Sequence, residues 1–518
     1  MLGKTNWTDH LHNIRKREID LVFSLLSRTH FVSGLEIGAG DGFQTTLLAP
    51  HIDKLISSDL NFKRIKDSLK VSNVEYRQVD ADNITGVFSP ASFDLIFSSN
   101  VLEHVRSPKT VLGATHKMLR DDGYAVHIVP SRAIKIFYLL LYYPHLFFLA
   151  IERLFGKLKG ESFFQGAGVN LGNNINLAVQ SPSSRFKKFL FPSVHGNFRS
   201  HGEEFIAYGR DKWEKLFTDN GYSVKAYANG PAFSGYGFGF NNLRRLLERL
   251  GVSSEHIFIL KKMSQFEVDT WAYTKKYLSH GSFRDQKKFV NDWLKKDKSA
   301  KAFFNDFQLA VGNPRGKKVL DIGFGNGIIA GEFIKAGALV YGLETEEDLV
   351  KMSGNSNMHL YDGRKFPFDR DSFDYVYSTS VLEHMSYPEE VIKEIGRTLK
   401  PGGKFYLSFP NRYAPKETHT GIWFISWLPR FKSKRLEDWN LHFVSFFALK
   451  KMANGAGLRI VYNTHSHSSI RRLVKQMLAF CGVHYGVLLK TIIIVLDKPA
   501  NEGKNYKNYN KSVLGENI

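Results

Sequence analysis

The sequence repeats itself at a long interval, and this repeat constrains the fold more than any other feature. Leu35–Gly42 returns as Leu320–Gly327 with five of eight positions identical at an offset of 285 residues. Phe93–Val105 returns as Phe373–Met385 with seven of thirteen positions identical at an offset of 280. Two matches in the same order and at nearly the same offset indicate two copies of one domain, and a chain of 518 residues has room for both.

Each copy alternates short apolar runs with segments of helical length. In the first copy the predicted strands are the run before Gly38 and residues 54–58, 74–79, 93–98 and 124–129. In the second copy they are residues 318–322, 338–343, 373–377 and 404–409. Apolar strands that alternate with helices are typical of a parallel sheet covered on both faces, so the sequence predicts an α/β fold.

The domain boundaries follow from changes in composition. We predict a first domain over residues 1–260 and a second over 261–498, which begins with a polar, aromatic and helical lead-in. An apolar insertion near 133–151 belongs to the first domain. Residues 499–518 are rich in Asn, Lys and Gly and nearly free of apolar side chains, so we predict a disordered tail there.

Composition limits the chemistry, the cellular location and the partners that we expect of the protein. The single cysteine, Cys481, excludes an intramolecular disulfide and a cysteine-based zinc or iron-sulfur site. Residues 1–26 lack the uninterrupted apolar core of a signal peptide, so we expect a cytoplasmic protein. The net charge of +21 favours polyanionic partners, which include nucleic acid, an anionic membrane face and phosphorylated small molecules.

The repeated glycine segments are candidate ligand loops. Each follows a predicted strand and reads G-x-G-x-G, at Gly38, Gly40 and Gly42 and again at Gly323, Gly325 and Gly327. Glycines there allow a tight turn and let a ligand lie against the backbone at the start of a helix. An acid follows the first glycine by 21 residues in both copies, as Asp59 and Glu344, where a carboxylate can accept both ribose hydroxyl protons.

These motifs resemble those of a known enzyme family. Glu36-Ile-Gly-x-Gly-x-Gly42, Asp59, Asp80-Ala81, Ser92-Phe-Asp94 and Val101-Leu-Glu-His104 resemble a class I S-adenosylmethionine-dependent methyltransferase of the type 11 kind. Asp321-Ile-Gly-x-Gly-x-Gly327, Glu344, Asp362-Gly363 and Val381-Leu-Glu-His384 match the pattern more fully. The resemblance implies two Rossmann-like seven-stranded domains in tandem, each with its last strand antiparallel and with S-adenosyl-L-methionine across the carboxyl ends of the strands.

The resemblance also implies roles for single residues. The acid of the first strand orders the glycine loop and approaches the amino-acid part of the cofactor, the acid of the second strand holds the ribose, and the acid after the third contacts adenine. The residue after the fourth strand lies where the methionine end and the acceptor meet. In the first copy two residues are candidates for the adenine contact: Asp80, which we favour, and Asp82. The predicted cofactor residues are Glu36, Gly38, Gly40, Gly42, Asp59, Asp80, Asp82, Asn100, Asp321, Gly323, Gly325, Gly327, Glu344, Asp362 and Ser380.

Histidines are the natural bases for a hydroxyl acceptor. His104 and His384 follow the predicted fourth strands, where a packing or orienting role is the alternative because the Leu-Glu-His triplet is general in the family. His201 and His419 lie after the fifth strands, where acceptor pockets of this fold are built. His195 is a further candidate in the same segment as His201. No cluster of Asp, Glu and His has a spacing that compels a metal site, so none is predicted.

The apolar segment Ala133–Ile151 has nearly the length of a membrane span. A span would place pieces of one sheet on opposite sides of the bilayer, and Lys135, Pro144 and His145 interrupt the segment. We therefore expect an interfacial helical hairpin or lid with nearby basic residues for phosphates or anionic lipid. The alternative is a simple wall of the acceptor pocket.

Together these features predict a tandem methyltransferase that O-methylates a sugar or lipid-linked glycan at the inner membrane face. Pro410-Asn-Arg412 and Glu417–Gly421 resemble methyltransferases of bacterial polysaccharide synthesis. The alternative is methylation of a lipid, quinone or other apolar small molecule. An RNA methyltransferase fits less well, because neither fourth strand ends in an Asn/Asp-Pro-Pro-aromatic loop, so we expect no nucleic-acid partner. The sequence does not fix the oligomeric state.

Overall fold

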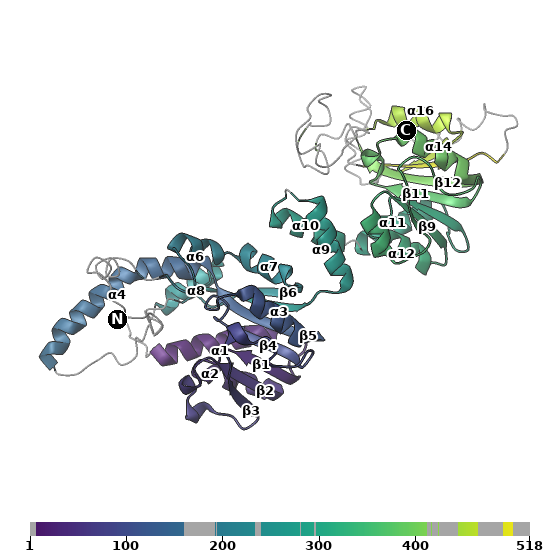
Figure 1. Cartoon of the computed structure of the whole chain (residues 1–518). Coiled ribbons are helices and arrows are strands. Elements are labelled where there is room, and N and C mark those ends of the chain that lie inside the picture. The colour runs from purple at the N-terminus through teal and green to yellow at the C-terminus, as the bar shows by residue number, and fades with distance from the viewer. Residues whose placement is uncertain are drawn as a thin grey trace. The chain divides into compact units, whose positions relative to one another are not determined.

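The structure is a computed structural model, and it describes residues 7–159, 192, 194–233, 240–279, 281–294, 297–411, 416, 423, 444–464 and 491–500 (Figure 1). The chain divides into two compact units, Met1–Val268 and Asp269–Ile518, which we call the first and second domains. Strand β7 (Glu255–Lys262) runs across the boundary that we predicted at residue 260, so the first domain extends further than expected. Most of the predicted tail, from residue 501 onward, lies outside the described residues.

The first domain contains a seven-stranded sheet in the order β3-β2-β1-β4-β5-β7-β6. β1, β2, β3, β4 and β5 are mutually parallel where they pair, and β7 is antiparallel to both β5 and β6. This order confirms the predicted class I architecture. The strands are β1 (Phe31–Ile37), β2 (Ile52–Asp59), β3 (Val74–Gln78), β4 (Phe93–Ser99), β5 (Leu119–Pro130), β6 (Tyr222–Asn229) and β7.

Helices cover both faces of this sheet, because neighbouring residues of the buried strands face opposite sides. On β4, Phe97 joins a core with Ile19 and Val22 of the first helix, whereas Ile96 joins a core with Leu112 of α3. The α-helices are α1 (Trp7–Leu25), α2 (Phe43–Leu48), α3 (Pro108–Met118), α4 (Arg132–Lys159), α6 (His201–Ala207), α7 (Arg210–Asp219) and α8 (Asn241–Arg249). Short 3-10 turns are η1 (Ala49–His51), η2 (Phe62–Arg64), η3 (Asp67–Leu69) and η4 (Ala81–Asn83).

The apolar insertion forms the long helix α4, which extends away from the sheet of the first domain (Figure 1). We expected a helical hairpin or lid, and the hairpin is wrong, because Arg132–Lys159 forms one helix of 28 residues that contains Pro144. A proline removes one backbone hydrogen bond and bends a helix without requiring the chain to reverse. No helix in the described part of the chain is both long and apolar enough to cross a bilayer.

The second domain repeats the topology as β10-β9-β8-β11-β12-β14-β13, with β14 antiparallel to its two neighbours. Its strands are β8 (Lys318–Ile322), β9 (Leu339–Glu344), β10 (Met358–Leu360), β11 (Phe373–Thr379), β12 (Leu399–Pro410), β13 (Arg459–Thr464) and β14 (Thr491–Asp497). Its described helices are α9 (Gln265–Tyr277), which begins within the first domain, α10 (Phe283–Leu294), α11 (Asp297–Ala310), α12 (Ile328–Lys335), α13 (Glu347–Ser353), η5 (Leu382–His384), α14 (Pro388–Thr398) and α16 (Phe446–Gly455). Two tandem class I domains are therefore confirmed.

Candidate active sites

The glycine loops lie at the carboxyl ends of β1 and β8, where ligands bind in sheets of this order. A Cβ atom at Gly38 would collide with Cγ2 of Val101, and one at Gly323 would collide with Cγ2 of Val381, so the loop backbone packs directly on the turn after the fourth strand. Gly40 is different, because nothing lies within 4 Å of the Cβ position there. This side of the loop is open to a ligand.

The acids that end β2 and β9 brace the middle glycine of each loop in the same way. Oδ2 of Asp59 accepts a hydrogen bond from the backbone N–H of Gly40 at 2.9 Å, and Oε2 of Glu344 accepts one from Gly325 at 3.1 Å. The second oxygen of each carboxylate accepts a backbone N–H just beyond the strand, from Asn61 or Thr345. Burial raises the pKa of the Glu344 carboxyl. The predicted ribose acids therefore occupy equivalent positions beside the loops.

The acids of the first strands face inward. Glu36 accepts hydrogen bonds from the hydroxyls of Thr45 at 2.5 Å and Ser57 at 2.8 Å, and Asp321 accepts one from the Tyr377 hydroxyl at 2.7 Å. Burial raises the pKa of Glu36 to about 7 and that of Asp321 to about 8. These carboxyl groups tie the first strand of each sheet to its neighbours, Glu36 to α2 and β2 and Asp321 to β11. Their predicted approach to the cofactor stays a prediction.

The open choice between Asp80 and Asp82 can be compared with the second domain. Asp80 accepts the backbone N–H of the residue two positions later, and Asp362 does the same. Asp82 instead accepts the backbone N–H of Arg106 at 2.7 Å and so fastens the turn after β4. Asp80 is therefore the structural counterpart of Asp362, and the choice of Asp80 as the adenine contact stays a prediction.

The residues after the fourth strands are held in a strained backbone conformation. Asn100 has φ 53° and Ser380 has φ 55°, a left-handed region that residues with a side chain rarely adopt. Such strain persists only where the surroundings enforce it, and it concentrates at functional sites. The Asn100 amide donates to Oε1 of Glu255 at 2.6 Å. The two domains thus place corresponding residues at the edge where the acceptor is expected.

A buried charged network lies beside Asn100, and the sequence analysis missed it. Arg15 of α1 contacts both carboxylate oxygens of Glu18 at 2.8 to 2.9 Å, the Ser99 hydroxyl at 2.8 Å and Oε1 of Glu255 at 3.4 Å. Glu18 and Glu255 are fully buried. Burial and the neighbouring Glu18 raise the pKa of Glu255 well above its usual range. Only the i, i+3 spacing of Arg15 and Glu18 was visible in the sequence.

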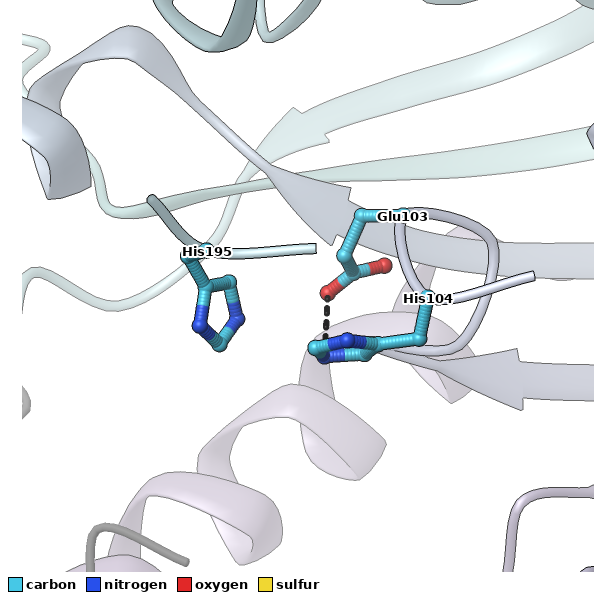
Figure 2. Close-up of side chains that lie close together, drawn as sticks. All are labelled: Glu103, His104 and His195. Carbon is cyan, nitrogen blue, oxygen red and sulfur yellow. Dashed lines mark ion pairs between the residues drawn. The ribbon is translucent and has the colours of Figure 1, made fainter. Parts of the chain in front are cut away.

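A second cluster brings together Glu103, His104 and His195 (Figure 2). Nε2 of His104 lies 3.9 Å from Oε1 of Glu103, and the two imidazole rings are 4.7 Å apart edge to face. Glu103 is 3% exposed, and neither of its carboxyl oxygens has a hydrogen-bond partner. The sequence analysis named both histidines but gave Glu103 no role, although the glutamate stands in the repeated Leu-Glu-His triplet.

Residues 195–197 are fastened to the turn after β4. The backbone N–H of Asn197 donates to the Glu103 carbonyl at 3.1 Å, and its side chain donates to the His104 carbonyl at 2.8 Å. Gly196 has φ 76°, and a Cβ atom there would collide with the Glu103 carbonyl oxygen. The position of His195 therefore depends on a glycine that permits this close approach.

A buried ion pair supports the same segment from the other side. Nζ of Lys135 donates to Oε2 of Glu204 at 2.5 Å, and the same oxygen accepts the backbone N–H of His195 at 3.2 Å. The ring of Tyr138 stacks on His195 with centroids 6.0 Å apart. His201 lies 4.0 Å from Oε2 of Glu204, beside the cluster and outside it.

The electrostatic environment lowers the pKa of both imidazoles. Burial, assisted by His104 and Lys135, lowers the pKa of His195 to about 4. Burial and Arg64 lower the pKa of His104. Burial raises the pKa of the Glu103 carboxyl to about 8. Neutral imidazoles can accept a proton or bind a metal ion.

The second domain covers its loop differently. His384 forms the same turn as His104, because its backbone N–H also donates to the residue three positions earlier. Trp293 of α10 lies 3.9 Å from the Cβ position of Gly325 and packs against Tyr273 with ring centroids 5.0 Å apart. His419 lies outside the described residues.

The residues present fit S-adenosylmethionine. The first loop offers an open side at Gly40, whereas the Trp293 ring lies against Gly325 in the second. Each domain also has a carboxylate at the end of the second strand and an aspartate after the third, which suit a ribose and an adenine respectively. No metal was predicted, and whether the predicted residues bind the cofactor or catalyse stays a prediction until it is measured.

Comparisons with known proteins agree with this fit. Two family models described as methyltransferase domains match residues 35–127 and 293–463. A ubiquinone biosynthesis O-methyltransferase of Coxiella burnetii is 29% identical over 164 residues, which are 30% of this chain and 68% of that protein. One of the same name from Thiobacillus denitrificans is 31% identical over 155 residues, 28% of this chain and 65% of that protein.

Solved structures are similar at lower identity. Phosphoethanolamine N-methyltransferase 2 of Haemonchus contortus, determined in complex with S-adenosyl-L-methionine, is 13% identical, with a TM-score of 0.31 and coverage of 94% of this chain and 99% of that one. An S-adenosylmethionine-dependent methyltransferase of Mesorhizobium loti is 16% identical, with a TM-score of 0.30 and coverage of 37% and 96%.

Proposed function

Because the chain is a tandem class I methyltransferase whose cofactor is S-adenosylmethionine, we propose that its first domain O-methylates a sugar or lipid-linked glycan. The observation that carries this proposal is the His104–His195 pair beside the buried Glu103, at the edge of the sheet where the glycine loop opens. A hydroxyl must lose its proton as it is methylated, and an imidazole at this edge can take it.

The proposed mechanism needs alignment more than covalent chemistry. The cofactor supplies an electrophilic methyl group on a sulfonium. Asp59 and Glu344 hold the ribose hydroxyls in their domains, and Asn100, held in place by Glu255, borders the reacting groups. His104 accepts the hydroxyl proton at Nε2, and burial and Arg64 lower the pKa of this imidazole. The imidazolium then passes this proton to water, and the buried Glu103 carboxyl, 3.9 Å away, orients the imidazole.

The acceptor is proposed to be amphiphilic because of the exposed face of α4. Ile136, Leu139, Leu140, Tyr143 and Phe147 are exposed and recur at helical spacing, with Leu140 at 66% and Phe147 at 63% exposure. The opposite face carries Lys135 and Tyr138, which contact the His195 segment. The same helix therefore borders the candidate acceptor site and offers an apolar stripe to a lipid chain or membrane surface.

A second candidate acceptor is a phenol of quinone biosynthesis. It is favoured by the names of the two curated relatives, which are both ubiquinone biosynthesis O-methyltransferases. Such acceptors also combine a hydroxyl with an apolar tail, so α4 does not separate the two candidates.

The acceptor can be tested with methyl-labelled S-adenosylmethionine and the full chain. Separate reactions contain lipid-linked oligosaccharide, a demethylated quinone precursor and total RNA. We expect label in the oligosaccharide and a loss of at least about 100-fold in the first-domain rate for His104→Gln, the lower range for general bases. Label in the quinone precursor would replace the glycan by the second candidate, and label only in RNA would contradict both.

The proposed membrane contact of α4 has its own test. The chain should sediment with anionic vesicles, less so at high salt, and Leu140→Ser with Phe147→Ser should remove most binding. Val32→Ser with Leu309→Ser is the matched control, because these side chains are also apolar and exposed, at 55% and 87%, but lie outside α4. Unchanged sedimentation of the α4 variant would leave this helix as a pocket wall only.

A further inference from the structure

We propose that Glu103, His104 and His195 form a binding site for a divalent transition-metal ion of the zinc class. The three side chains come from the turn after β4 and from the segment that precedes α6. They converge on one point in Figure 2, with Glu103 and His104 on one side and His195 facing them. Each offers one ligand atom, and these atoms all lie within 4.8 Å of one another.

The distances suit a site that closes slightly on its ion. Zinc binds nitrogen and carboxylate oxygen at about 2.1 Å in a tetrahedron, so ligand atoms on one ion lie roughly 3.4 Å apart. The Glu103–His104 pair at 3.9 Å needs a contraction of a few tenths of an ångström. His195 needs a movement of the order of 1 Å, which a rotation of its side chain supplies. No backbone rearrangement is required.

An independent observation points to a ligand at this place. Glu103 is buried, and both of its carboxyl oxygens lie in the interior with no hydrogen-bond partner. A buried carboxyl group without partners is costly, so native proteins seldom retain one that has no task. One carboxyl oxygen of Glu103 faces the His104 ring, with His195 beside them, and a cation between the three side chains would satisfy the group (Figure 2).

Neighbouring residues hold the three proposed ligands in place through hydrogen bonds, as they do in known metal sites. Asn197 fastens both Glu103 and His104 through their carbonyl groups, and the Lys135–Glu204 pair fixes the backbone of His195. Asn197 donates to backbone oxygen atoms, so its contacts do not occupy the side chains of Glu103 and His104.

The donor set identifies the class of ion and its use. Two imidazole nitrogens and one carboxylate oxygen bind zinc and its neighbours in the first transition series, and three protein ligands leave a coordination position open. If the proposed function holds, the acceptor hydroxyl takes that position and releases its proton to water. The oxygen then forms its bond to the methyl carbon as the sulfur–carbon bond breaks and the sulfonium becomes a neutral thioether. In this arrangement His104 binds the ion and does not act as the base, because the ion activates the hydroxyl instead.

Cobalt(II) tests the site without reference to activity, because its visible absorption reports nitrogen and oxygen ligands in a low coordination number. The metal-free full chain is titrated with Co²⁺ alone and compared with His195→Asn, His104→Gln and Glu103→Gln. We expect each variant to bind one Co²⁺ ion fewer per chain than the unaltered protein, or to bind that ion at least tenfold more weakly. His30→Asn is the matched control, since it removes an exposed histidine paired with Asp53 at 2.7 Å and should change nothing.

The outcomes separate this inference from the proposed function. Calorimetry with S-adenosylhomocysteine shows that each variant retains a folded first domain. Unchanged Co²⁺ binding in both histidine variants, or no binding by the unaltered chain at millimolar Co²⁺, would overturn the metal site and leave the methyltransferase proposal standing. Loss of binding in the variants supports the site even if no acceptor is methylated. Activity that survives chelation of the bound ion would overturn its catalytic role.

Discussion

The two domains share a cofactor edge and differ in what surrounds it. Their glycine loops, bracing acids and strained residues after the fourth strand correspond position by position. The helix that leads into the first strand holds different residues in the two domains. At the offset of 285, Arg15 and Glu18 of α1 align with Ala300 and Phe303 of α11. The residues that shape the glycine loop are therefore alike in the two domains, whereas the residues that surround the loop differ.

Strand pairing extends this correspondence to the last strand. Pro130 of β5 pairs with Glu255, and Pro410 of β12 pairs with Thr491. The charged group Arg15–Glu18–Glu255 of the first domain is thus replaced by Ala300, Phe303 and Thr491 in the second. Ala300 and Phe303 are apolar where Arg15 and Glu18 are charged, and Thr491 is an exposed neutral residue where Glu255 is a buried acid. The second domain also adds the aromatic pair Tyr273 and Trp293 near its loop. Such different walls favour different acceptors.

The largest expected effect comes from filling one loop at a time. Gly40→Arg and Gly325→Arg place a side chain where the ligand is expected, and each should remove one of two S-adenosylhomocysteine sites in calorimetry. Mass spectrometry should show each variant missing a different methyl group. Gly86→Arg is the control, because Gly86 also has positive φ and open space but lies away from the loop. The same product from both variants would mean that the domains are redundant.

Breaking the charged group should have the next largest effect. Arg15→Ala leaves two buried carboxylates without their cation and should cost the first domain about 3 to 5 kcal/mol of unfolding free energy. The triple change Arg15→Ala, Glu18→Phe and Glu255→Thr copies the second domain and should restore most of that loss. Chemical denaturation measures both variants. A triple variant no more stable than the single one would contradict the proposed equivalence.

The cofactor edge could be predicted from the sequence because its determinants are local. A glycine that packs on the next turn, as Gly38 packs on Val101, and an acid at a strand end leave motifs that the repeat makes visible. The different roles of Asp80 and Asp82 in the fold needed the structure, because only the structure shows that Asp82 accepts the backbone N–H of Arg106 whereas Asp80 caps the turn that follows it. Which of them contacts adenine stays a prediction.

The walls could not be predicted because they join distant segments. Arg15 and Glu255 are 240 positions apart, and Glu103 and His195 are 92 apart, with no pattern in the sequence that links either pair. The predicted hairpin failed for a different reason. Pro144 indicates a break in a helix, but a long exposed helix can bend at a proline and continue.

A smaller effect concerns acid stability and a single core position. His127 of β5 pairs with Ser98, and its counterpart beside Ser378 is Leu407. His127 is fully buried, and burial lowers its pKa to about 3. Between the usual histidine pKa of about 6.5 and this value the unfolded chain takes up a proton that the folded chain does not. His127 therefore makes the first domain less stable as the pH falls.

The change that tests this effect is His127→Leu, which gives the first domain the residue of the second. The slope of the unfolding free energy below pH 6.5 should flatten by up to about 1.4 kcal/mol per pH unit, the value for one proton. Ser98 loses its partner Nδ1 of His127 at 2.7 Å, but Ser378 shows that a serine here can donate to the first strand instead, to the Ile322 carbonyl at 3.2 Å. Urea unfolding at pH 7.5, 6 and 5 measures the slope, with Leu407→Ala as a variant that destabilises the second domain without changing its pH dependence. An unchanged slope in His127→Leu would mean that His127 takes up its proton in the folded state as readily as in the unfolded chain, and that the acid sensitivity of the first domain arises elsewhere.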